Sequence, residues 1–194
     1  MPRSALAAPR GWSLSARWLR ACCWPRRRSS GLTRSPPPHR RGTRHSYGGT
    51  VMTYRQITRD YAVSGQITPE ELPALKEAGF TTIVNNRPDS EIPPQVQAAP
   101  MRAAAETAGL VFVDNPFSPM ALDMDLVERQ AGAMSGADGP VLAYCATGNR
   151  CTVLWALAHV KAGAVTPNAA VETAAAQGYD LRGLLPQLTA LAPS

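Results

Sequence analysis

The sequence has few metal-ligating residues and no long apolar run, and both absences limit what the protein can be. Its 194 residues include three histidines and four cysteines, and no CxxC pair, so we expect no zinc or iron–sulfur site. No stretch approaches the roughly 18 consecutive apolar residues of a membrane span, which predicts a soluble protein without a membrane partner. Neither the GxGxxG nor the GxxxxGK[ST] nucleotide-binding pattern occurs, and we expect no cofactor.

Acidic residues are missing from the first 51 positions. This segment contains eleven arginines and no lysine, for a charge of +11, whereas nine basic and fourteen acidic residues from Met52 onward give −5. The pI of 9.5 is therefore a property of the N-terminal segment. Because the remainder is acidic, we do not expect it to bind nucleic acid.

The basic segment, residues 1–51, is rich in arginine, serine and proline and has the composition of a disordered leader. An organelle transit peptide would share this composition, and a secretory signal would need an apolar region that is missing here. A basic tail that binds nucleic acid or anionic lipid is a further alternative. We favour a translation start placed too far upstream, with Met52 as the real beginning, and we predict one domain over residues 52–194.

Strand and helix patterns alternate along this domain. The predicted strands are residues 61–64, 81–86, 110–114 and 141–144. The predicted helices are residues 68–79, 95–108 with a kink or restart at Pro100, 122–134, 152–160, 166–177 and 184–191. This order indicates an α/β fold with a mainly parallel sheet flanked by helices. Ligands bind at the carboxyl ends of such strands, so we expect Cys145 and the loops 87–91 and 115–120 to share one site.

The strongest functional signal is an apolar strand that ends in a cysteine, a glycine loop and an arginine. Loop N–H groups and the dipole of the following helix would hold an anion above Cys145 and lower the pKa of its thiol. Gly148 would let the loop curl around an oxyanion, and the planar guanidinium of Arg150 could bind two oxygens of that anion. An inert, buried cysteine is the alternative. We predict that Cys145 and Arg150 are catalytic and that the anion-binding loop comprises Ala146, Thr147, Gly148, Asn149 and Cys151.

Four separated motifs resemble a known family. They are Val63-Ser64-Gly65-Gln66-Ile67, Asn86-Arg87-Pro88-Asp89, Leu142-Ala143-Tyr144-Cys145 with Gly148 and Arg150, and Gly178-Tyr179-Asp180-Leu181. In this order they are similar to the phosphatase-like domain of bacterial beta-lactamase-hydrolase-like proteins, a family also described as sulfur transferases. The resemblance covers about residues 52–191. It implies a cysteine-phosphatase-like fold, related to dual-specificity phosphatases, with Cys145 as nucleophile and Arg150 as anion clamp.

The resemblance leaves two chemistries to choose between. Tyrosine and dual-specificity phosphatases have five residues between the cysteine and the arginine, whereas Cys145 and Arg150 are separated by four, as in rhodanese-like sulfurtransferases. Phosphatases also usually have histidine before the nucleophile, where this chain has Tyr144. They need a general acid, and the corresponding loop, residues 115–119, has no carboxylate. Asp89, Asp114 or Asp123 could substitute, but each has a simpler explanation, as a turn residue, a strand end and a helix-start charge respectively.

Sulfur transfer needs no such acid, so we predict a cytoplasmic sulfurtransferase that carries a persulfide on Cys145. A small anionic sulfur donor and a thiol acceptor would be its partners. One alternative is a phosphatase that acts on a phosphorylated substrate through a phosphocysteine, and another is a non-catalytic anion-binding module. The sequence does not predict the oligomeric state.

Several residues near the loop have two interpretations each. Arg87 either supplies a second positive charge beside Asp89 or forms a surface salt bridge with Asp89 or Glu91. Cys151 either replaces a small hydroxyl residue or resolves an oxidised or persulfidated Cys145 by forming a disulfide. We expect Trp155 and Tyr179 to pack beneath the loop.

Overall fold

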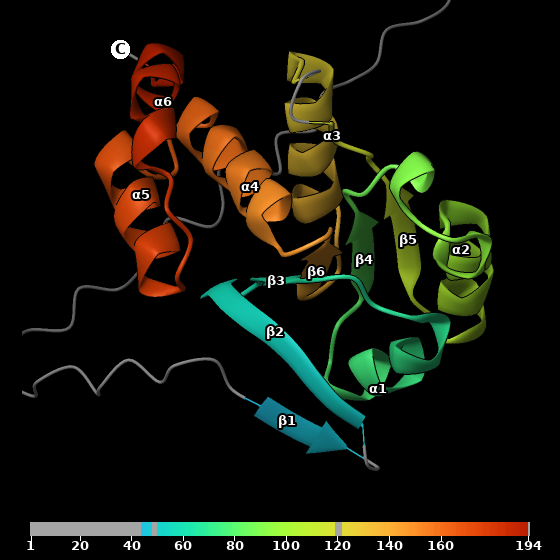
Figure 1. Ribbon diagram of the computed structural model, residues 1–194. Helices are drawn as coiled ribbons and strands as arrows, with labels where there is room; N and C mark the ends of the chain where they lie inside the picture. The colour runs from blue at the N-terminus through green and yellow to red at the C-terminus, as the bar shows by residue number, and fades with distance from the viewer. Residues whose placement is uncertain (1–43, 48–49, 119–121, 194) are drawn as a thin grey trace, which may run out of the picture. The chain divides into compact units, whose positions relative to one another are not determined.

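The computed structural model describes residues 44–47, 50–118 and 122–193, with side chains from Thr53 onward (Figure 1). Its strands are β1 (Arg44–Tyr47), β2 (Thr50–Thr58), β3 (Tyr61–Ser64), β4 (Thr82–Asn85), β5 (Val111–Asp114) and β6 (Val141–Tyr144). Its α-helices are α1 (Leu72–Glu77), α2 (Ala98–Thr107), α3 (Met124–Ser135), α4 (Asn149–Lys161), α5 (Pro167–Ala176) and α6 (Leu185–Leu191). Short 3-10 turns cover Pro69–Glu71, Asp89–Glu91, Pro94–Val96 and Arg182–Leu184.

The strands form one sheet in the order β1-β2-β3-β6-β4-β5. Four of them, β3, β6, β4 and β5, are parallel, and β2 and β1 extend the sheet in antiparallel orientation. Asn85 pairs with both Tyr144 and Asp114, and Ser64 pairs with Tyr144, so the four parallel strands end level with one another. The expected α/β fold with a mainly parallel sheet is confirmed.

Helices cover both faces of the sheet, as expected for parallel strands (Figure 1). Alternate strand residues point to opposite faces. On one face, Val63 and Ala143 pack with residues of α3, α4, α5 and α6, among them the fully buried Trp155. On the other, Ala62 and Leu142 pack with residues of α1 and α2. These two cores fix the strands whose carboxyl ends carry the candidate site.

Some element boundaries differ from those predicted. The break in the 95–108 segment lies at Gln97, because α2 begins at Ala98 and Pro100 occupies its first turn, where a proline removes no helical hydrogen bond. Helix α4 begins at Asn149, three residues earlier than predicted. Strand β2 was not predicted, and it starts two residues before Met52. The domain boundary at Met52 stays a prediction.

None of the helices in the described part of the chain is long and apolar enough to cross a membrane.

Candidate active site

The ends of three parallel strands meet at the predicted site. Backbone hydrogen bonds continue one residue past each strand: the N–H of Asn86 donates to the carbonyl of Tyr144 (2.8 Å) and that of Asn115 to the carbonyl of Asn85 (2.9 Å). The N–H of Cys145 donates to the carbonyl of Ser64 (3.3 Å). The Cys145 loop and the loops that follow β4 and β5 therefore leave the sheet side by side, as the sequence predicted.

Cys145 is fully buried at the start of its loop. The N–H of Gly148 donates to its sulfur over 3.2 Å. The Cys151 thiol and the N–H groups of Thr147, Cys151 and Arg150 also hydrogen-bond to the sulfur, and together they outweigh burial and hold the pKa of Cys145 at about 5. At neutral pH the side chain is a thiolate, the form that acts as a nucleophile.

Gly148 allows the loop to close tightly around the sulfur. It adopts φ +87° at the N-cap of α4, a conformation that favours glycine. A Cβ at this position would lie 2.3 Å from the hydroxyl oxygen of Tyr179. That hydroxyl donates to the carbonyl of Thr147 (3.1 Å), so Tyr179 braces the loop in addition to packing beside it.

Arg150 projects from the first turn of α4 toward the loop that follows β4. Its Nη2 donates to Oε2 of Glu91 over 2.7 Å, and this hydrogen bond lowers the pKa of Glu91. Its Nη1 is buried and has no hydrogen-bond partner in the described part of the chain. One side of the guanidinium thus holds a carboxylate while a second donor is left for a bound anion.

Arg87 forms the salt bridge that the sequence allowed, and its partner is Glu91 rather than Asp89. Nε of Arg87 lies 3.5 Å from Oε2 of Glu91, and Nη2 donates to the Glu91 carbonyl (3.2 Å). Nη1 donates to Oε1 of Gln66 (3.1 Å). Glu91 therefore joins Arg87 to Arg150. This role depends on the tertiary fold, and the sequence named Glu91 only as one of two salt-bridge partners.

The three aspartates considered as proton donors all have structural partners. Oδ1 of Asp89 accepts from the N–H of Ala98 at the start of α2 (2.8 Å). Oδ1 of Asp114 accepts from Nδ2 of Asn85 (2.9 Å), and Asp123 caps α3 by accepting from the N–H of Leu126 (3.0 Å). None of these contacts involves Cys145, and the simpler structural interpretations account for them.

The sequence did not indicate the buried polar network that lies beneath the site. Oε1 of Gln130, on α3, accepts from Nδ2 of Asn86 (3.0 Å) and from Nδ2 of Asn115 (3.1 Å). Its Nε2 donates to the hydroxyl of Tyr61 (3.0 Å), which in turn donates to the carbonyl of Cys151 (3.0 Å). Gln130 therefore links all three loops of the site. A polar residue on an amphipathic helix gives no sign in the sequence that it is buried.

A cavity of about 350 Å³ adjoins the loop. Its lining includes Ser64, Gln66, Thr147, Tyr179 and Arg55. Its position beside Thr147 leaves room for the part of a substrate that extends beyond the anion.

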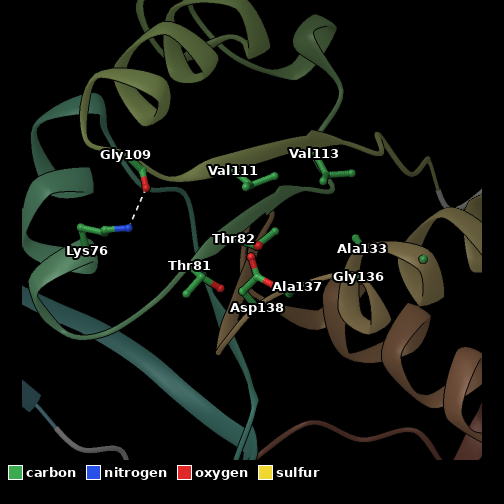
Figure 2. Close-up of a pocket in the computed structure, with 11 residues that line it drawn as sticks. Lys76, Thr81, Thr82, Gly109, Val111, Val113, Ala133, Gly136, Ala137 and Asp138 are labelled. Carbon is green, nitrogen blue, oxygen red and sulfur yellow. Dashed lines mark hydrogen bonds between the residues drawn. The ribbon is translucent and has the colours of Figure 1, made fainter. Parts of the chain in front are cut away.

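A larger cavity, of about 470 Å³, lies away from Cys145 at the amino ends of the strands (Figure 2). It is lined by Thr82 at the start of β4, Val111 at the start of β5, and residues after α3 such as Ala137. Parallel sheets bind their ligands at the opposite edge. No group of three metal-ligating side chains occurs within the described ranges.

Comparison with known proteins agrees with this geometry. Residues 53–164 match the model of the phosphatase-like domain of beta-lactamase hydrolase-like proteins. The chain belongs to this family. The beta-lactamase hydrolase-like protein of Agrobacterium fabrum is 31% identical over 127 residues, which cover 65% of this chain and 29% of that protein. The Xylella fastidiosa (strain Temecula1) protein is 30% identical over 125 residues, or 64% and 29% of the two chains. The chain thus matches under a third of the length of these relatives.

A solved structure supports the same placement of the phosphatase-like domain. The crystal structure of a putative phosphatase from Neisseria meningitidis shares 28% identity and a TM-score of 0.62, covering 71% of this chain and 96% of that one. The expected cysteine-phosphatase-like fold is therefore confirmed. The phosphatase alternative fits these relatives better than sulfur transfer does.

Proposed function

We propose that the protein is a cysteine-dependent phosphatase that hydrolyses a phosphate monoester. The observation that carries the proposal is the buried Cys145 thiolate, held by the N–H of Gly148 (3.2 Å) and by the Cys151 thiol. The family match and the similarity to the Neisseria meningitidis structure support phosphoryl transfer over the transfer of sulfane sulfur.

In the proposed reaction the Cys145 thiolate attacks phosphorus, an S–P bond forms and the P–O bond breaks, which gives a phosphocysteine. The alkoxide or phenolate that leaves takes its proton from solvent water. Water then attacks phosphorus, which releases phosphate and restores the thiolate. Loop N–H groups and Nη1 of Arg150 stabilise the equatorial oxygens. Nη2 of Arg150 remains paired with Glu91, which holds the guanidinium in place while Nη1 meets the anion.

The free thiols of Cys145 and Cys151 fit a reducing compartment, and the proposal accordingly places the protein in the cytoplasm.

Sulfur transfer is the second candidate, and the carboxylates of the site favour it. Asp89, Asp114 and Asp123 are held by structural contacts, and Glu91 is held on Arg150 with a lowered pKa, which makes it a poor proton donor. A phosphatase built this way would depend strongly on the leaving group. A persulfide reaction would have no such requirement, because sulfite and thiolates leave without protonation.

The test measures turnover by the full-length protein and its Cys145→Ser variant with a series of aryl phosphates and, in parallel, with thiosulfate plus cyanide. We expect phosphate release that requires Cys145 and that falls steeply as the leaving phenol becomes more basic. Thiocyanate formation without phosphate release would replace the proposal with sulfur transfer. Turnover of neither donor, with Cys145 still open to alkylation, would indicate an anion-binding module.

A further inference from the structure

The residue after the loop arginine is a second thiol in contact with the nucleophile. Cys145 and Cys151 are both free, both fully buried and members of one packed cluster. The N–H of Gly148, the N-cap of the helix that carries Cys151, donates to the Cys145 sulfur (3.2 Å), and the Cys151 thiol lowers the pKa of Cys145. A serine or threonine here would make a similar hydrogen bond but could not form a bond to sulfur.

Cys151 and its neighbour Thr152 are held by buried hydrogen bonds. The hydroxyl of Tyr61 donates to the carbonyl of Cys151 (3.0 Å), and Gln130 fixes that hydroxyl (3.0 Å). On the preceding turn, the carbonyl of Gly148 accepts from both the N–H (3.1 Å) and the hydroxyl (2.9 Å) of Thr152. The first turn of α4 that carries Cys151 is therefore fixed by buried contacts, in the same packed cluster as Cys145.

The two sulfurs also differ in protonation. Hydrogen bonds lower the pKa of Cys145, whereas burial and the neighbouring Cys145 sulfur raise the pKa of Cys151. One member of the pair is thus a reactive thiolate and the other a thiol that carries a proton. This is the arrangement of an oxidisable cysteine beside its resolving partner.

We propose that Cys145 and Cys151 form a reversible modification site for hydroperoxides, with an intraloop disulfide as the product. The Cys145 thiolate attacks the distal oxygen of the hydroperoxide, so that an S–O bond forms, the O–O bond breaks and an alkoxide, or hydroxide, leaves. The Cys151 sulfur then attacks the sulfur of Cys145. The S–O bond breaks, and the hydroxide that leaves takes the Cys151 proton as water.

The disulfide removes the nucleophile while protecting it from further oxidation. An external dithiol restores both thiols by exchange and is itself oxidised to a disulfide. The proposal holds whether Cys145 transfers phosphate or sulfur, because it depends only on the two thiols. Its test accordingly uses peptide mapping and alkylation in place of turnover.

Trypsin provides a direct readout because it cuts after Arg150, between the two cysteines. Full-length protein is treated with a low excess of hydrogen peroxide, alkylated and digested without reduction. We expect the peptide 130–150 to be linked to the peptide 151–161 and to separate again when a dithiol is added. The remaining cysteines, Cys22 and Cys23, fall in a different peptide, so linkage to them is distinguished.

The Cys151→Ser variant is the matched control. Its hydroxyl still donates a hydrogen bond but cannot form the disulfide, so Cys145 should proceed to sulfinic and sulfonic acids and lose its recovery by dithiol. Oxidation of Cys145 in the wild-type protein without linkage to Cys151 would overturn the proposal. Linkage to Cys22 or Cys23, or linkage only in denaturant, would overturn it equally, and neither result depends on the variant being folded.

Discussion

The hydrogen bond from the Cys151 thiol to Cys145 should be the largest single contribution to the low pKa of the nucleophile. It is the first of the causes that hold this pKa at about 5. A hydrogen bond to a charged group contributes about 1.5–3 kcal/mol, and about 1.4 kcal/mol corresponds to one pH unit. Replacing Cys151 with alanine should therefore raise the pKa of Cys145 by about one to two pH units.

The assay is the rate of alkylation by iodoacetamide as a function of pH, since only the thiolate reacts. In wild-type protein the rate should rise as the pH passes about 5. In Cys151→Ala this rise moves to higher pH, and the rate at pH 5 falls by about tenfold. Cys151→Ser keeps a donor and should remain close to the wild type. An unchanged profile in Cys151→Ala, or an equal shift in Cys151→Ser, would refute the reasoning.

Three further substitutions test other contacts. Gly148→Ala should lower the free energy of unfolding by more than the ~1–2 kcal/mol of the positive φ alone, because the new Cβ would overlap the Tyr179 hydroxyl. Gln130→Leu should lower the free energy of unfolding by about 3–5 kcal/mol, because three buried partners lose their hydrogen bonds. Urea unfolding measures the effect of both substitutions. Glu91→Gln should tighten the binding of inorganic phosphate up to about fivefold by releasing Nη2 of Arg150, as followed by calorimetry.

Each substitution has a matched control elsewhere in the chain. Gly79 also has a positive φ, of +96°, but a Cβ there would meet nothing within 4 Å, so Gly79→Ala isolates the backbone cost. Gln187 is exposed on α6, and Gln187→Leu should change stability by less than about 0.5 kcal/mol. Glu128→Gln removes the same charge from a pair with Lys161. The reasoning fails wherever a control matches the effect of its test substitution.

Local patterns were enough to predict most of the fold. Buried parallel strands such as β3 and β6 are short apolar segments of the sequence, and both begin and end where predicted. The capping pattern at Thr68 also has its expected partner, because the N–H of Thr68 donates to Oε2 of Glu71 (2.7 Å). Strand β2 was not predicted, because polar residues such as Gln56 interrupt its apolar pattern.

The candidate site was predictable only in part. The position of Cys145 at a strand end and the glycine at 148 are local features, and the sequence identified both. The contact between Glu91 and Arg150 joins residues 59 positions apart. The role of Gln130 depends on hydrogen bonds to Asn86, Asn115 and Tyr61, which lie far from it in the sequence. Spacing within one loop also suggested sulfur transfer, whereas comparison over the whole domain supports phosphatase chemistry more strongly.

The most direct test of the proposed function is to trap the covalent intermediate. Full-length protein is mixed with an activated aryl phosphate, quenched in acid within the first turnover and digested, and the mass of the peptide 130–150 is measured. The phosphatase proposal predicts the added mass of one phosphoryl group on Cys145 and its absence in Cys145→Ser. An unmodified peptide, together with a persulfide on Cys145 after the same experiment with thiosulfate, would contradict it.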